Sequence, residues 1–133
     1  MVHHGRAGGA LFAPEAPHTS IIPSLTPVEG ETIVVKSLPN AFAGTELHRL
    51  AQATGRKQII VGGFATHMCV SATVRAALDL GWRTTVVAAA TASRDLPNPL
   101  GGVVPAQSVH EATLAALADR FAIVVRDTAA LTA

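Results

Sequence analysis

Apolar and polar positions follow two spacings along the chain, and these predict strands and helices in alternation. Residues 70–80 carry apolar side chains at helical spacing, and Gly81 is a typical helix stop. Three continuous apolar runs instead indicate strands buried on both faces, at residues 57–61, 84–88 and 121–125.

The region after the second of these strands is predicted to be a loop followed by a helix. Residues 91–105 contain polar residues and a glycine pair, which are typical of a loop. Ser108 and Glu111 then have the spacing of a capping box, which predicts a helix from there to about Asp119.

The first forty residues are predicted to be mostly irregular. Five of the eight prolines fall within residues 12–39, which favours an extended loop. Inside this loop, residues 32–35 are a strand candidate that ends at Lys36. Beyond it, Thr45 is placed to cap a short helix that stops at Gly55.

The order of the elements predicts one α/β domain over residues 1–133. Strands separated by single helices pair in parallel through right-handed crossovers, and helices should cover both faces of their sheet. Four strands and three helices make a thin version of this fold. A fifth and a sixth strand are therefore expected before Met1, and residues 2–4 have the pattern of a strand's end.

Composition excludes several classes of partner. The chain has 10 Lys and Arg against 9 Asp and Glu, and this balance predicts binding neither to nucleic acid nor to an anionic membrane. No apolar run reaches the ~18 residues of a membrane span, and no secretory leader opens the chain, so we expect a cytoplasmic protein. With charged residues at only 14%, part of the alanine- and valine-rich surface is expected to lie in a homo-oligomer.

The single cysteine lies where a predicted strand gives way to a helix. Residues 62–70 read GGFATHMCV, which places Cys69 at or beside the first turn of that helix. Unpaired N–H groups and the helix dipole at this position favour a thiolate over a thiol. Ligands also bind at the carboxyl ends of parallel strands. Cys69 is therefore a candidate nucleophile, although a lone cysteine in an apolar stretch is more often a small buried side chain.

Several segments closely resemble the isochorismatase-like cysteine hydrolases. The most specific match is residues 63–70 (GFATHMCV), followed in register by residues 75–81 (RAALDLG). Residues 91–97 (TASRDLP) and the helix around His110 also resemble family segments. Lys36 and the following residues 40–45 (NAFAGT) resemble the segment that carries the family's catalytic lysine. The resemblance covers most of the chain from about residue 12.

This resemblance implies a Rossmann-like parallel sheet flanked by helices and a site made of an aspartate, a lysine and a cysteine. Cys69 would attack a carboxamide or similar carbonyl carbon, and Lys36 would stabilise its thiolate. In the family, the peptide bond matching Phe64–Ala65 is often cis. The backbone N–H groups of Ala65 and Cys69 would then form an oxyanion hole.

One element of the family pattern is missing from this sequence. The family aspartate ends the first strand, and no aspartate precedes Lys36. The glutamates available there, at 15, 29 and 31, lie in or near the proline-rich loop. The chain is therefore expected to lack the family's N-terminal strand–helix segment. It would be a fragment of a longer chain, receive the strand from another chain, or have lost the reaction.

Four further side chains are candidates for a substrate pocket. These are Phe12, Phe42, Phe64 and His67, for which core packing or a structural hydrogen bond is the simpler alternative. Arg94 and Asp95 are expected to form a local ion pair or a subunit contact. His110 is expected to serve packing within its helix.

No metal or cofactor is expected. The histidines and Cys69 lack the spacing of a structural zinc site, and the metal-binding pattern of the family's nicotinamidases is absent. Gly62–Gly63 matches neither a phosphate-binding loop nor a dinucleotide fingerprint. True isochorismatases lack the nucleophilic cysteine, so Cys69 argues against isochorismate as the substrate.

The sequence therefore predicts a cofactor-independent hydrolase that uses Cys69 to cleave the C–N bond of a small amide through a thioester. One alternative is a non-catalytic family member or fragment that serves as a subunit or binding module. Another is a redox-responsive thiol protein. The hydrolase and the non-catalytic family member are distinguished by whether an aspartate from any source reaches Cys69.

Overall fold

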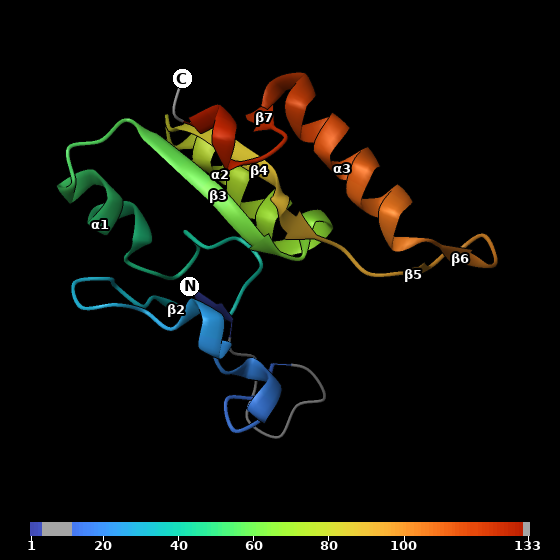
Figure 1. Ribbon diagram of the computed structural model, residues 1–133, viewed down its shortest axis with the longest axis horizontal. Coiled ribbons are helices and arrows are strands. Elements are labelled where there is room, and N and C mark those ends of the chain that lie inside the picture. Colours follow the sequence, from blue (N-terminus) through green and yellow to red (C-terminus); the bar gives the residue numbers. More distant parts are fainter. Residues whose placement is uncertain (4–11, 132–133) are drawn as a thin grey trace.

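The centre of the molecule is a three-stranded parallel sheet, seen in a computed structural model that describes residues 1–3 and 12–131 (Figure 1). Its strands lie in the order β3–β4–β7. They are β3 (Gln58–Phe64), β4 (Arg83–Ala92) and β7 (Ile123–Val125). The three strands predicted from continuous apolar runs, and their parallel pairing, are confirmed.

A second, two-stranded parallel sheet joins β1 (Val2–His3) to β2 (Val35–Lys36). Val2 pairs with Val35, and His3 pairs with Lys36. The prediction of a strand end near the start of the chain is confirmed for residues 2–3, whereas His4 lies outside the described residues. The strand predicted over residues 32–35 is shorter than expected, because only its end finds a pairing partner.

Three α-helices connect or follow the strands: α1 (Leu47–Ala53), α2 (Ser71–Asp79) and α3 (Ala106–Arg120). The N-cap residue of α1 is Glu46 rather than the predicted Thr45, which lies one position earlier and whose hydroxyl accepts a hydrogen bond from the Leu47 N–H at 3.2 Å. After α1 and α2, Gly55 and Gly81 adopt φ values of +70° and +80°, the left-handed conformation that commonly ends a helix.

The predicted start of α3 is wrong. Ser108 lies inside the helix, which begins at Ala106 after the N-cap residue Pro105. Asp95, eleven positions earlier, accepts a hydrogen bond from the Ala106 N–H at 2.7 Å. A carboxylate brought in by the fold therefore caps the helix, in place of the local hydroxyl that the sequence pattern suggested.

The segments predicted as loops are largely irregular. The stretch after β4 contains a small antiparallel hairpin of β5 (Leu96–Pro97) and β6 (Val103–Val104), which the sequence did not predict. The proline-rich region contains two single 3₁₀ turns, Pro17–Thr19 and Pro23–Leu25. A third such turn, Thr128–Leu131, follows β7.

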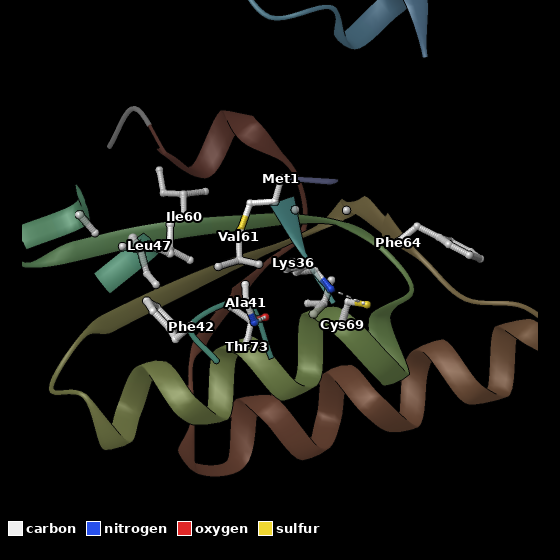
Figure 2. A pocket seen from close by; sticks show the side chains of 15 residues that line it. Met1, Lys36, Ala41, Phe42, Leu47, Ile60, Val61, Phe64, Cys69 and Thr73 are labelled. Carbon is white, nitrogen blue, oxygen red and sulfur yellow. Dashed lines mark hydrogen bonds between the residues drawn. The ribbon is translucent and has the colours of Figure 1, made fainter. Parts of the chain in front are cut away.

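The hydrophobic core lies between the sheet and two helices. Val74 of α2 and Leu117 of α3 pack against Val86 of β4, and all three are fully buried. Val61, Val86 and Val124 occupy one register row across the three strands and point toward these helices. Figure 2 shows α2 and α3 side by side on this face of the sheet.

The opposite face of the sheet is more open than expected. Ile60, Thr85 and Ile123 form the neighbouring register row, so their side chains point away from α2 and α3. Ile60 is 62% exposed and Ile123 is 66% exposed. Within the described residues, the expected helical cover is therefore complete on one face only.

None of the helices in the described part of the chain is both long and apolar enough to cross a membrane.

Leu117 provides a direct test of this core. Replacing Leu117 with Ala should lower the free energy of unfolding by about 2–5 kcal/mol, because the side chain is fully buried and leaves a cavity. Urea denaturation followed by circular dichroism measures this loss. Leu100 is 94% exposed, so Leu100→Ala should leave stability nearly unchanged. Equal effects of the two variants would contradict the described packing of α3.

Candidate active site

Cys69 lies in a one-turn π-helix, Thr66–Val70, that connects the end of β3 to α2. The Ala65 carbonyl closes this turn by accepting hydrogen bonds from the N–H groups of Met68 at 3.1 Å and Val70 at 3.2 Å. The predicted position of Cys69, at a strand-to-helix corner, is confirmed. The peptide bond between Phe64 and Ala65 is cis, as the family resemblance implied.

The glycine pair before this turn is required by the backbone geometry. A Cβ at Gly62 would lie 3.1 Å from the Ala90 carbonyl oxygen of β4, a contact too close to accept without movement. Gly63 has a φ of +128°, where side chains are strained. At this point the register of β3 against β4 shifts, since Val61 pairs with Val86 and Gly63 pairs with Thr91.

Lys36 meets Cys69 from the other side of the site. Its Nζ lies 3.3 Å from the Cys69 Sγ and also donates to the carbonyl oxygens of Leu38 at 2.9 Å and Pro39 at 3.2 Å. The lysine is only 7% exposed. No carboxylate among the described residues lies within salt-bridge distance of it. Among the described residues, the ionisable group that this buried lysine contacts is the cysteine sulfur.

A threonine on α2 anchors the loop that carries Lys36. The Thr73 hydroxyl accepts a hydrogen bond from the Ala41 N–H at 3.0 Å and lies 3.4 Å from the Pro39 carbonyl oxygen, to which it donates. Thr73 is buried, and Ala41 is 3% exposed. The loop after β2 is thus fixed to the helix that follows Cys69.

A cavity of about 370 Å³ opens above the lysine–cysteine pair. Figure 2 shows Lys36 and Cys69 pointing toward one another at this cavity. Most of the other lining groups are apolar, and they come mainly from β3, from α1 and from the segment before α1, with single residues from the start of the chain, the cysteine turn and α2. They are Met1, Ala41, Phe42, Leu47, Ala51, Ile59, Ile60, Val61, Gly62, Gly63, Phe64, Val70 and Thr73.

The predicted pocket residues divide into two groups. Phe42 and Phe64 line the cavity, and Phe64 is largely exposed at its edge. Phe12 and His67 are not among the residues that line it. Ala65 is buried, precedes the turn that carries Cys69 as its N-cap residue, and is not among the residues that line the cavity.

His67 bonds to the loop that follows β4. Its Nδ1 lies 3.1 Å from the Ser93 hydroxyl. Burial, and then the nearby positive charge of Arg94, lower the pKa of His67 below its ordinary value. The expected ion pair between Arg94 and Asp95 is wrong, because the Arg94 guanidinium donates to the Asp95 backbone carbonyl and the Asp95 carboxylate caps α3.

Sequence reasoning missed one residue at this site. His110 of α3 was assigned to packing, yet its Nδ1 lies 2.9 Å from the Thr66 hydroxyl at the start of the cysteine turn. The two residues are 44 positions apart, so no local pattern connects them.

Among residues 1–3 and 12–131, no three His, Cys, Asp or Glu side chains are grouped so that they could hold a metal ion.

Known proteins with similar sequences and structures agree with this architecture. A family model described as the isochorismatase domain matches residues 2–129. The secreted isochorismatase effector Isc1 of Verticillium dahliae is 39% identical over 125 residues, which cover 94% of this chain and 63% of that protein. A streptothricin hydrolase of Streptomyces noursei is 37% identical over 131 residues, which cover 95% of this chain and 48% of that protein.

A crystal structure of an isochorismatase from Pseudomonas putida superimposes with a TM-score of 0.89 at 45% identity. The match covers 97% of this chain and 65% of that one. Fold and site together define an α/β protein with a lysine–cysteine pair at the carboxyl end of a parallel sheet. The chain belongs to the isochorismatase family, whose matched members include hydrolases. It spans about half to two thirds of the length of these relatives.

The depressed pKa of His67 can be measured by an NMR titration of its ring protons. The midpoint should lie below the ordinary value of about 6.5 and should rise in Arg94→Ala, while burial keeps it below that value. Because the unfolded chain then binds this proton more tightly, the His67 contribution should lower stability as the pH falls below about 6.5. Arg120→Ala, at the far end of α3, should leave the midpoint unchanged. A midpoint at or above 6.5 would contradict the described environment.

Proposed function

We propose that this chain carries the nucleophile of a cysteine-dependent hydrolase that cleaves an amide-type C–N bond of a small molecule. The 3.3 Å contact between the Lys36 Nζ and the Cys69 Sγ is the observation that carries the proposal. A buried ammonium beside a thiol favours the nucleophilic thiolate, and here the pair faces a cavity at the carboxyl end of β3.

In the proposed reaction, the Cys69 thiolate attacks the carbonyl carbon of the amide. The negative charge that develops on the carbonyl oxygen is stabilised by the backbone N–H groups of Ala65 and Cys69. The C–N bond then breaks as the Lys36 ammonium donates a proton to the departing amine. Water next attacks the resulting thioester and gives a proton to the neutral Lys36, so that the acid is released and the thiolate–ammonium pair is restored.

The shape of the cavity supports a small substrate. Its volume of about 370 Å³ is within the range of sites that bind small molecules, and its lining is mainly apolar. Phe42 and Phe64 stand on the walls, while Lys36 and Cys69 supply the polar centre. This arrangement suits a substrate whose amide reaches the polar centre while its apolar part contacts the walls.

The family membership supports hydrolysis, since one relative is named a streptothricin hydrolase. This chain matches only about half of that protein. The substrate of this chain is therefore proposed only at the level of its reacting bond.

A second candidate function is a subunit or binding module without catalysis of its own. It is favoured by the lack of a carboxylate within salt-bridge distance of Lys36 in the described residues. A thiol-dependent hydrolase needs a group that accepts the cysteine proton, and the family resemblance assigns this role to an aspartate. Measurements of thiol reactivity and of amide turnover separate the two functions.

Thiol reactivity tests the lysine–cysteine pair. Intact mass measurements should show that iodoacetamide alkylates Cys69 at pH 6 about tenfold faster than it alkylates Cys69 in a Lys36→Met variant, which lacks the ammonium. Lys57→Met is the matched control, because Lys57 is exposed at the start of β3 and lies outside the cavity lining. Identical rate–pH profiles for the wild-type chain and Lys36→Met would contradict the proposed activation.

Amide turnover tests the reaction itself. Incubation with a panel of small primary and secondary amides should release amine and leave an acyl adduct on Cys69 that intact mass detects. Cys69→Ser should lose both the adduct and at least about a hundredfold in turnover, because a hydroxyl is far less ionised than a thiol. A reactive Cys69 that turns over no amide would favour the non-catalytic function.

A further inference from the structure

The turn that carries Cys69 is held to α3 by one buried polar contact. The Thr66 hydroxyl lies 2.9 Å from the Nδ1 of His110, which is in the second turn of α3. Thr66 is completely buried, and His110 is half-buried. Among the described residues, His110 is the side chain that satisfies this hydroxyl, which would otherwise be a buried polar group without a partner.

Thr66 also links the cysteine turn to α2. Its carbonyl accepts a hydrogen bond from the N–H of Ser71, the first residue of α2. The preceding carbonyl, of Ala65, binds the N–H groups of Met68 and Val70. Cys69 lies between these bonded positions. A rotation of Thr66 would therefore be transmitted to the backbone that orients the cysteine.

The same turn contacts α3 through a second, apolar group. Val70 is 4% exposed and belongs to the cluster that contains Leu117 of α3. Thr66 and Val70 thus rest on α3 at the two ends of the turn. Cys69 instead lies against Lys36, which approaches from β2.

We propose that His110 is a positioning residue for Cys69, acting through Thr66. The hydrogen bond fixes the start of the cysteine turn on α3, so that the sulfur stays within contact distance of the Lys36 ammonium. His110 is not among the residues that line the cavity, and its hydrogen bond is to Thr66. Its role is to hold the geometry on which the reactivity of the thiol depends.

This inference rests on the lysine–cysteine pair of the proposed function but does not require amide turnover. The readout is the rate of Cys69 alkylation by iodoacetamide at pH 6, measured on folded protein. His110→Ala and Thr66→Val should each lower this rate severalfold, up to the roughly tenfold loss expected for Lys36→Met, because a displaced sulfur loses its contact with the ammonium that favours the thiolate.

Two conservative variants should restore the rate. Thr66→Ser keeps the hydroxyl, and His110→Asn carries a polar atom at the position of Nδ1. Thr113→Val is the matched control, since Thr113 also lies on α3 but its hydroxyl bonds only to the Val109 carbonyl within that helix. It should leave the alkylation rate unchanged.

A double-mutant cycle distinguishes positioning from a general loss of structure. If His110 acts through the lysine–cysteine contact, Lys36→Met should slow alkylation less in the His110→Ala background than in the wild-type chain. Independent, multiplicative effects of the two variants would overturn the proposal. So would a Thr66→Val rate equal to that of Thr66→Ser, a comparison that remains usable if His110→Ala fails to fold.

The outcome is separable from that of the proposed function. A chain that hydrolyses no amide but shows the expected His110 dependence of alkylation would retain the positioning role and lose the hydrolase assignment. Amide turnover that persists unchanged in both His110→Ala and Thr66→Val would support the hydrolase assignment and overturn the positioning role.

Discussion

A buried positive charge is the constraint around which the site is arranged. The Lys36 ammonium is almost fully removed from water, and its hydrogen-bond partners are two backbone carbonyls and the sulfur of Cys69. A buried cation is tolerated only where nearby groups compensate for lost hydration. The cysteine is therefore part of what makes the position of the lysine acceptable.

The two partners come from separate parts of the chain, and the fold brings them together through α2. Lys36 ends β2, in the smaller sheet, whereas Cys69 follows β3 in the larger one. Thr73 of α2 holds the loop after β2 with two hydrogen bonds, and the cysteine turn runs directly into the same helix. The positions of Lys36 and Cys69 are thus both fixed relative to α2.

The elements that the sequence predicted correctly are those determined by residues close to one another in the chain. The apolar runs of β3 and β4, the glycine stops after α1 and α2, and the cysteine corner could be read from short stretches of sequence. The features that were missed depend on distant partners. Asp95 caps α3 from eleven positions away, and His110 meets Thr66 across 44 positions. The contact between Lys36 and Cys69 was expected only because the family resemblance pointed to it.

The backbone around Cys69 is more tightly constrained than the cavity wall formed by α1. Around Cys69, the backbone is constrained by the close approach of Gly62 to β4, by the positive φ of Gly63 and by a buried polar contact. The wall formed by Leu47 and Ala51 belongs to α1, a helix with no fully buried residue. Substitutions along this helix would therefore reshape one wall of the cavity while leaving the constraints around Cys69 in place.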